Sequence, residues 1–359
     1  EHTGRTCEDK SSGRKSGESG RETWRSRDKA SGESEIHRST GQGISRRQDT
    51  GCAEADGGLS YDEGRSGSIC TVELVREAAI IKAPMKIGIV CCSDGIKRIY
   101  ENEIEELHRT LADMGIESVF SPFLYARDGV VSGTAEERAK AVMDFYKDDT
   151  IDAICDISGG DIANGILPYL DYSMIAKTNK QFWGYSDLTT VLNAIYAKTG
   201  QTGVLYQIRN VIYNEREQQM ADVQNVLCDG GDALYRIDYH YVQGTQMHGI
   251  VVGGNIRCFL KLAGTAYMPD LHGKILLLES RSGTVARMET YLSQLQQIGA
   301  FEQIAGILLG TFTEMEAKQC TPDIVQLVVR YAGDNMPIAV TGQIGHGTDA
   351  KGIVIGAEL

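Results

Sequence analysis

Ser186 is the residue whose surroundings best suit covalent chemistry. It follows the apolar run Phe-Trp-Gly-Tyr at residues 182–185, and apolar side chains recur at helical spacing over residues 188–195. A hydroxyl between a strand and a helix stands at the edge of a parallel sheet, where the helix N-terminus favours developing negative charge. The full G-x-S-x-G elbow is absent because Leu188 follows Asp187, and a serine that only caps the helix is the alternative.

A serine nucleophile needs a general base, and His346 is the histidine best placed to be one. Of the seven histidines, only His346 lies in a glycine-rich loop that follows a predicted buried strand. Gly345 and Gly347 remove bulk on both sides and permit a sharp turn, so the imidazole can project into a cleft. The alternative is an ordinary surface histidine.

Glu279 is the candidate for the acid that orients this base. It ends the apolar run Ile-Leu-Leu-Leu at residues 275–278. A carboxylate at the end of a buried strand is unfavourable unless something pairs with it. A structural ion pair with Arg281 or Arg287 is the alternative to a catalytic role.

The remaining sequence predicts an α/β fold that would position these side chains. The predicted strands cover residues 85–92, 116–120, 151–157, 182–185, 250–252, 274–278, 305–309, 338–341 and 352–355. The predicted helices cover residues 104–114, 134–146, 162–169, 188–195, 215–227, 255–263, 285–298 and 322–331. Strands that alternate with helices favour a parallel sheet, and Gly159, Gly160 and Ser186 all follow predicted strands, where such sheets bind ligands.

The composition divides the chain into four parts. Residues 1–84 form a disordered or non-native extension, since Gly, Ser, Arg, Glu and Asp dominate the first 70 or so. An N-terminal α/β domain with the nucleophile covers residues 85–205, and a linker covers residues 206–247. A smaller strand-rich domain with the acid and the histidine covers residues 248–359. We hypothesise that translation normally starts at Met85, and an intact mass that includes residues well upstream would contradict this.

Charge and cysteine usage exclude several classes of protein. The net charge of −13 argues against a nucleic-acid or anionic-membrane partner. No apolar run approaches the ~20 residues of a membrane helix. The nine cysteines show neither C-x-x-C spacing nor clustering with histidine. These features predict a cytoplasmic protein without a metal site.

Taken together, these motifs resemble the LD-carboxypeptidase family of serine peptidases, which includes the microcin C self-immunity proteins. The resemblance runs from about residue 85 to 356. Its anchors are Gly-Tyr-Ser-Asp-Leu-Thr at 184–189, Ser-Gly-Gly at 158–160, Gly-Gly-Asn at 253–255, Leu-Ala-Gly-Thr at 262–265, the strand at 275–279, Gly-Ile-Leu-Leu-Gly at 306–310 and Ile-Gly-His-Gly at 344–347.

The resemblance implies a Ser186–Glu279–His346 triad in a cleft between two domains, a homodimer, and no metal or cofactor. The N–H groups of Gly160 and Asp187 are the expected oxyanion donors. Further substrate contacts are expected from Gly159, Asp161, Asn164 and Arg281. A helix-capping role is the alternative for Asp161, and an ion pair with a nearby acid is the alternative for Arg281.

The family cuts an amide bond next to a free terminal carboxylate. Release of terminal D-alanine from murein tetrapeptide is the expected reaction, and cleavage of an aminoacyl-nucleotide by a microcin C-type immunity amidase is the alternative. Residues 279–288 look more like the immunity branch, although residues 235–241 offer tyrosines and no tryptophan for stacking on a nucleobase. An α/β-hydrolase esterase and a non-catalytic peptide or nucleotide binder are more distant alternatives.

Overall fold

The computed structural model describes residues 84–359. All but the last residue of the predicted extension therefore lies outside the described residues.

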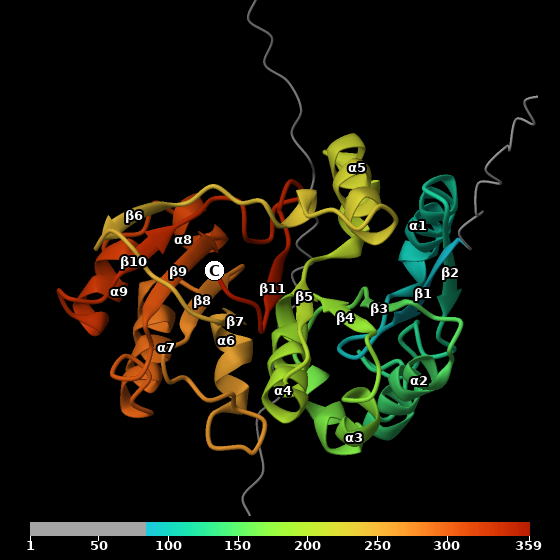
Figure 1. Cartoon of the computed structure of the whole chain (residues 1–359), viewed down its shortest axis with the longest axis horizontal. Coiled ribbons are helices and arrows are strands. Elements are labelled where there is room, and N and C mark those ends of the chain that lie inside the picture. Colours follow the sequence, from blue (N-terminus) through green and yellow to red (C-terminus); the bar gives the residue numbers. More distant parts are fainter. Residues whose placement is uncertain (1–83) are drawn as a thin grey trace, which may run out of the picture. The chain divides into compact units, whose positions relative to one another are not determined.

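Two sheets form the framework of residues 84–359 (Figure 1). The first has the strand order β11-β5-β4-β3-β1-β2, and the second has the order β6-β10-β9-β8-β7. All neighbouring strands are parallel except that β11 is antiparallel to β5 and β6 is antiparallel to β10. The strands are β1 Met85–Val90, β2 Ile116–Phe120, β3 Ala153–Asp156, β4 Gln181–Gly184, β5 Gly203–Leu205, β6 His240–Gln243, β7 Val251–Asn255, β8 Ile275–Ser280, β9 Gly306–Phe312, β10 Ile338–Val340 and β11 Ile353–Ile355. The predicted α/β class is confirmed, and the structure shows that both sheets are largely parallel.

Helices connect the strands, as the sequence periodicity predicted. The α-helices are α1 Glu101–Asp113, α2 Ala135–Lys147, α3 Tyr172–Ile175, α4 Thr189–Thr199, α5 Arg216–Leu227, α6 Ile256–Phe259, α7 Val285–Gln297, α8 Thr313–Ala317 and α9 Ile324–Ala332. The 3-10 helices are η1 Arg98–Tyr100, η2 Ala163–Tyr169, η3 Ser186–Leu188, η4 Ile208–Ile212, η5 Ala233–Tyr235 and η6 Leu260–Leu262. Thr134 begins α2 with a capping box that it shares with Glu137.

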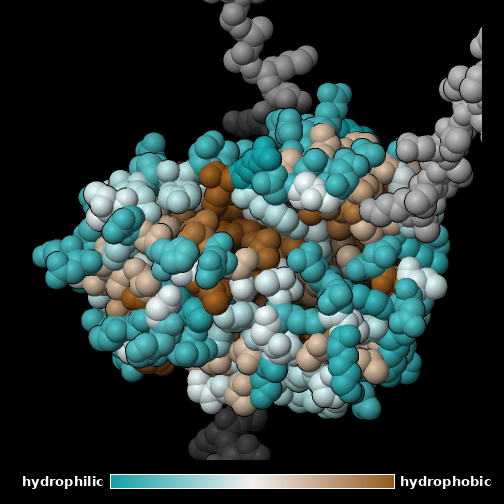
Figure 2. Space-filling model, in the orientation of Figure 1, coloured by the Kyte–Doolittle hydropathy of each residue, from teal (hydrophilic) through white to brown (hydrophobic). Residues whose placement is uncertain are grey.

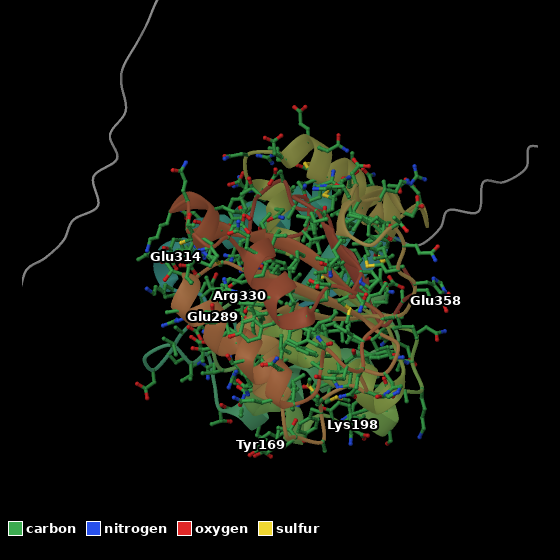
Figure 3. The ribbon with its side chains drawn as sticks, turned by 90° about the vertical axis from the view of Figure 1, so that its left-hand side faces the viewer. Tyr169, Lys198, Glu289, Glu314, Arg330 and Glu358 are labelled. Carbon is green, nitrogen blue, oxygen red and sulfur yellow. The ribbon has the colours of Figure 1, made fainter. Side chains whose placement is uncertain are left out.

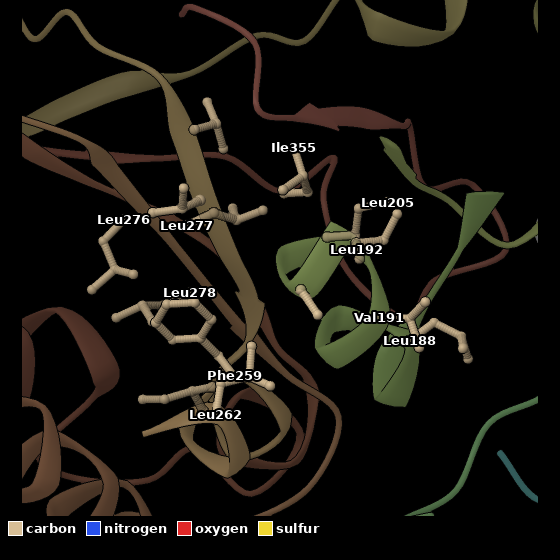
Figure 4. Close-up of a cluster of buried hydrophobic side chains, with 14 of the residues drawn as sticks. Leu188, Val191, Leu192, Leu205, Phe259, Leu262, Leu276, Leu277, Leu278 and Ile355 are labelled. Atoms are coloured by element: carbon tan, nitrogen blue, oxygen red, sulfur yellow. The ribbon is translucent and has the colours of Figure 1, made fainter. Parts of the chain in front are cut away.

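Helix α4 is the element that joins the two sheets. It contacts β4 and β5 of the first sheet and also β7 and α6 of the second half. Its apolar residues belong to a buried cluster that also contains β8, and Figure 4 shows Val191 and Leu192 on the side of the cluster opposite Leu276–Leu278. The helix that begins beside the candidate nucleophile is therefore held by the hydrophobic core from both sides.

Three predicted elements differ from the structure. The predicted helix over residues 255–263 is the short helix α6 followed by the 3-10 helix η6. The predicted helix over residues 162–169 is the 3-10 helix η2, and Pro168 inside it cannot donate the backbone hydrogen bond that an α-helix would need. The last strand, which we expected in the C-terminal sheet, is β11 and pairs with β5 of the first sheet. The chain thus returns to the first sheet at its end, while the predicted domain bounds remain a prediction.

Polar and apolar side chains are distributed as the fold requires. On the face shown in Figure 2, hydrophobic residues gather near the middle and hydrophilic residues surround them. Glu289 of α7 and Arg330 of α9 form an exposed ion pair at 3.1 Å, and Figure 3 shows the two side by side.

Every helix within residues 84–359 is too short or too polar to span a bilayer. Cys91, Cys92, Cys155 and Cys258 are buried, and burial raises the pKa of the Cys258 thiol to about 12.

Candidate active site

The turn at Ser186 is a sharp elbow between β4 and α4. Ser186 has a φ of 56°, in the left-handed region that residues other than glycine rarely adopt. A Cβ on Gly184 would lie 2.6 Å from Leu188 Cβ, so only glycine permits Leu188 to pack over the strand end. The Leu188 N–H donates to the Tyr185 carbonyl at 3.0 Å and closes the turn. A leucine two residues after Ser186 is thus compatible with the elbow, although the sequence lacks the glycine common at that place.

His346 lies beside Ser186, although the two are 160 residues apart. Its Nε2 is 3.1 Å from Ser186 Oγ, and no capping hydrogen bond from Ser186 is found among residues 84–359. Gly345 allows the loop to reach this place, because a Cβ there would overlap Thr311 Oγ1 on β9. The Thr311 N–H donates to the Ile344 carbonyl at 2.8 Å and anchors the loop to β9.

Glu279 completes a chain of three side chains. It is fully buried, and its Oε2 lies 2.9 Å from His346 Nδ1. The Tyr185 hydroxyl donates to the same oxygen at 3.2 Å. Neither Arg281 nor Arg287 bonds to Glu279 within the part of the chain that the structure describes, so the structural ion pair is not formed. Glu279 Oε1 has no hydrogen-bond partner among those residues.

A buried hydrogen-bond network holds the glycine loop at residues 158–160. Asp156 is at the end of β3, and its carboxylate accepts hydrogen bonds from the Ser158 N–H at 2.7 Å, the Ser158 hydroxyl at 2.5 Å and the Cys92 N–H at 2.6 Å. Burial raises the pKa of the Asp156 carboxyl despite these bonds. Gly160 has a φ of 139°, and a Cβ there would overlap the Asp94 carboxylate. Only glycine therefore fits at this position of the loop, which lines the same cavity as Ser186.

Asp187 connects the elbow to the second half of the protein. It is fully buried, and its carboxylate accepts hydrogen bonds from the Ser93 hydroxyl at 2.7 Å and the Ala163 N–H at 2.8 Å. Lys261 Nζ, from the segment after β7, pairs with it at 2.5 Å. The residue after the candidate nucleophile is therefore fixed from both halves of the structure.

Asp161 and Asn164, which we predicted to contact the substrate, are not among the residues that line the cavity at Ser186. The Asp161 carboxylate pairs with Arg257, and Lys261 Nζ donates to the Asp161 carbonyl at 2.9 Å. Asp161 does not cap η2, whose N-cap is Ile162. Asn164 is exposed on η2 and does not line the cavity at Ser186. The substrate-binding roles of both residues stay untested predictions.

A cavity of about 490 Å³ opens at Ser186 and His346. The predicted residues Gly159, Gly160 and Arg281 line it. Its other lining residues, which we had not predicted, are Ser158, Tyr185, Tyr206, Gln207, Arg209, Asn210, Tyr213, Thr313, Gly345, Gly347, Thr348, Ala350 and Lys351. No Asp or Glu is among the lining residues within 84–359, so the cavity is cationic in a protein whose net charge is −13. Such a cavity favours anionic ligands.

Several of these residues lie in the segment that we had interpreted as a linker. Arg209 and Asn210 belong to η4, which follows directly after the short strand β5. The available signal was the apolar run Gly-Val-Leu at residues 203–205, because a strand there ends at the same edge as β4. By contrast, none of the tyrosines at residues 235–241 lines the cavity in the described structure.

Across residues 84–359 there is no group of three or more His, Cys, Asp or Glu residues that could hold a metal ion.

Comparison with known proteins defines the family. Residues 87–207 match the LD-carboxypeptidase N-terminal domain, and residues 248–359 match the LD-carboxypeptidase C-terminal domain. The chain therefore belongs to the LD-carboxypeptidase family, as its motifs had indicated.

Individual relatives represent both branches considered above. The chain is 25% identical over 263 residues to the probable murein peptide carboxypeptidase of Bacillus subtilis, covering 69% of this chain and 80% of that one. It is 27% identical over 211 residues to the microcin C7 self-immunity protein MccF of Escherichia coli, covering 50% of this chain and 61% of that one. The structure of MccF in complex with glutamyl sulfamoyl guanosine has the same fold, with a TM-score of 0.68 at 20% identity, covering 77% of this chain and 92% of that one.

Proposed function

We propose that this protein is a serine carboxypeptidase that releases terminal D-alanine from murein tetrapeptide. The observation that carries the proposal is the unbroken chain from Ser186 Oγ to His346 Nε2 at 3.1 Å and from His346 Nδ1 to Glu279 Oε2 at 2.9 Å. Such an arrangement of hydroxyl, imidazole and carboxylate activates serine in unrelated hydrolases. Membership in the LD-carboxypeptidase family supports the same chemistry.

In the proposed mechanism, Ser186 Oγ attacks the carbonyl carbon of the terminal amide bond. His346 Nε2 accepts the serine proton, while Glu279 holds the imidazole tautomer and stabilises the imidazolium. The N–H groups of Gly160 and Asp187 bind the oxyanion, and each such donor contributes roughly 3 kcal/mol in the transition state. His346 then protonates the leaving amine, which departs as D-alanine, and a water molecule hydrolyses the acyl-enzyme by the reverse proton transfers.

The electrostatics of the cavity support an anionic substrate. Arg209 and Arg281 line it, and no carboxylate does so within the described residues. Lys351 also lines it but is paired with Asp222. A peptide that ends in a free carboxylate would be attracted to this cavity and oriented in it. The same charge would repel a cationic peptide.

Cleavage of an aminoacyl-nucleotide is the second candidate, and one observation favours it. The ring of Tyr213 lines the cavity and is partly exposed, so it is an aromatic surface on which a base could stack. MccF, a relative of this chain, has been solved with glutamyl sulfamoyl guanosine. Against this candidate, Tyr206 also lines the cavity but is only 1% exposed, so its ring offers no free face to a base.

The two candidates are separated by offering purified protein murein tetrapeptide and a processed aminoacyl-nucleotide, with products identified by mass spectrometry. We expect D-alanine release, and a loss on the order of 10⁶-fold in Ser186→Ala. Ser173→Ala is the control, because Ser173 is exposed on α3 and bonds only locally to Asp171. Cleavage of the nucleotide alone would favour the immunity function, and undiminished activity of Ser186→Ala would contradict both.

The homodimer implied by the resemblance and the cytoplasmic location predicted from the cysteine pattern belong to the same proposal. Analytical ultracentrifugation tests the first, and fractionation of the source cell tests the second.

A further inference from the structure

The loop after β5 lies beside the loop that carries Ser186. β4 and β5 are parallel, with Gly184 paired to Leu205. Their C-terminal ends therefore share one edge of the sheet, and η4 begins within three residues of that edge at Ile208. Together with the glycine loop after β3, three neighbouring parallel strands supply three adjacent walls of the cavity.

Arg209 on η4 brings an unpaired cation to this cavity. It lines the cavity together with Ser186 and His346. Its Nε is buried and has no hydrogen-bond partner within residues 84–359, and no carboxylate there forms a salt bridge with its guanidinium. A buried donor without an acceptor is unfavourable, so the free protein leaves this group ready for an anionic partner.

The other two cations of the cavity are less suited to that role. Lys351 is already neutralised, because Nζ pairs with Asp222 and also donates to the Ala233 carbonyl at 3.1 Å. Arg281 is exposed, and a solvated guanidinium gains less from an ion pair than a half-buried one. Arg209 thus combines partial burial with the absence of a protein partner among the described residues.

We propose that Arg209 is the residue that binds the terminal carboxylate of the substrate, and that it sets the preference for a free carboxyl terminus. The inference rests on the proposed carboxypeptidase function and identifies how its substrate is read. The guanidinium offers a planar pair of donors that matches a carboxylate in a bidentate arrangement. The neighbouring Asn210 also lines the cavity and is buried, and its side-chain NH₂ can donate a further hydrogen bond to the same carboxylate.

The experiment compares two ligands that differ only at the carboxyl terminus, murein tetrapeptide and its C-terminal carboxamide. Binding is measured by calorimetry to full-length Ser186→Ala, so that neither ligand is consumed. We expect the acid to bind about 100-fold more tightly than the amide, as is typical for hydrogen bonds to charged groups. Adding Arg209→Gln should bring the ratio of the two affinities near one, because only binding of the acid becomes weaker. Arg209→Lys should retain part of the preference for the acid, because the charge remains.

Arg330→Gln is the matched control, because Arg330 is an exposed arginine on α9 that pairs with Glu289. It should leave the ratio unchanged, and the melting temperature of Arg209→Gln should stay near that of its parent since no protein partner is lost. A ratio that survives Arg209→Gln overturns the inference. So does a ratio that collapses in Arg281→Gln but not in Arg209→Gln, or equal binding of acid and amide to Ser186→Ala.

Turnover separates this inference from the proposed function. If the acid preference depends on Arg209 but the enzyme with Ser186 intact does not cleave the tetrapeptide, the carboxylate assignment stands and the proposed reaction fails. If the tetrapeptide is cleaved but the preference of the protein for the acid over the amide does not change in Arg209→Gln, the proposed reaction stands and the carboxylate assignment fails.

Discussion

Glu279 is a fully buried carboxylate whose hydrogen-bond partners in the described structure are a histidine and a tyrosine. No arginine or lysine neutralises it there, and Oε1 has no partner. Such a group is expected to destabilise the fold, because burial removes the hydration of a carboxylate and an unmatched acceptor regains little of it. We propose that it is retained because it fixes the His346 ring and stabilises positive charge on it.

Glu279→Gln should therefore separate activity from stability. We expect kcat for the tetrapeptide to fall about 10⁴-fold, because a side-chain amide can donate to Nδ1 and favour the wrong tautomer. The melting temperature should stay the same or rise, since the buried charge is removed at almost constant volume. Steady-state kinetics and thermal unfolding of the same preparation check both. A variant that melts much lower and loses activity only in proportion would indicate a structural role instead.

The sequence was sufficient to predict the three side chains that the structure brings together, because each ends or follows an apolar run with glycine nearby. It was insufficient to predict the contacts of Tyr185 and Lys261 or the place of Arg209 in the cavity. Tyr185 bonds to Glu279 across 94 residues, and Lys261 reaches Asp187 across 74. Partners this distant depend on how two sheets pack, which local periodicity does not encode.

At the scale of elements, the loop that carries His346 is positioned by close backbone packing. A Cβ on Gly345 would overlap Thr311 Oγ1, whereas a Cβ on Gly342, in the same loop, would meet nothing within 4 Å. Neither glycine has a positive φ, so space alone distinguishes the two positions. The loop is thus tightly packed at Gly345, next to the histidine, whereas at Gly342 there is space for an added side chain.

Gly345→Ala and Gly342→Ala form a matched pair. Gly345→Ala should push the loop from β9, lower the free energy of unfolding by roughly 1–3 kcal/mol and reduce kcat sharply, because the His346–Ser186 distance would change. Gly342→Ala should be neutral or slightly stabilising, because it restricts the unfolded chain. Urea unfolding and kinetics test the pair. Equal effects of the two changes would show that Gly345 packing does not position His346.

Most elements could be predicted from periodicity, and those that differ have physical reasons. Helix α1 and strand β2 follow clear apolar patterns that are bounded by Gly115, whose φ is 76°. Strand β11 has only three residues, Ile353–Ile355, and nothing in such a short run states which sheet it will join. Its antiparallel pairing with β5 is set by where the chain emerges after the His346 loop.

At the scale of the whole described structure, residues 84–359, the ion pair between Lys261 and Asp187 links the two halves behind the site. Asp187 is fully buried, and the Lys261 side chain is 19% exposed. The same junction is filled by the apolar cluster around α4 (Figure 4). Apolar burial stabilises this junction, while the ion pair fixes the position of the turn at Ser186 relative to the second half.

Lys261→Met should cost about 3–5 kcal/mol of unfolding free energy, because it leaves the Asp187 carboxylate buried without its cation. Lys318→Met is the control, since Lys318 pairs with Glu314 on the exposed surface of α8 and should change stability by no more than ~0.5 kcal/mol. Urea titration of both variants gives the comparison. Similar small changes in the two would mean that the linking ion pair contributes nothing beyond a surface pair.

The central claim is that Ser186 is a nucleophile activated by His346, and reaction with a fluorophosphonate probe tests it most directly. The account predicts one adduct, mapped by mass spectrometry to the peptide that contains Ser186, with a labelling rate at least ~10³-fold lower in His346→Ala. An adduct at another residue, or labelling of Ser186 that is equally fast without His346, would contradict it.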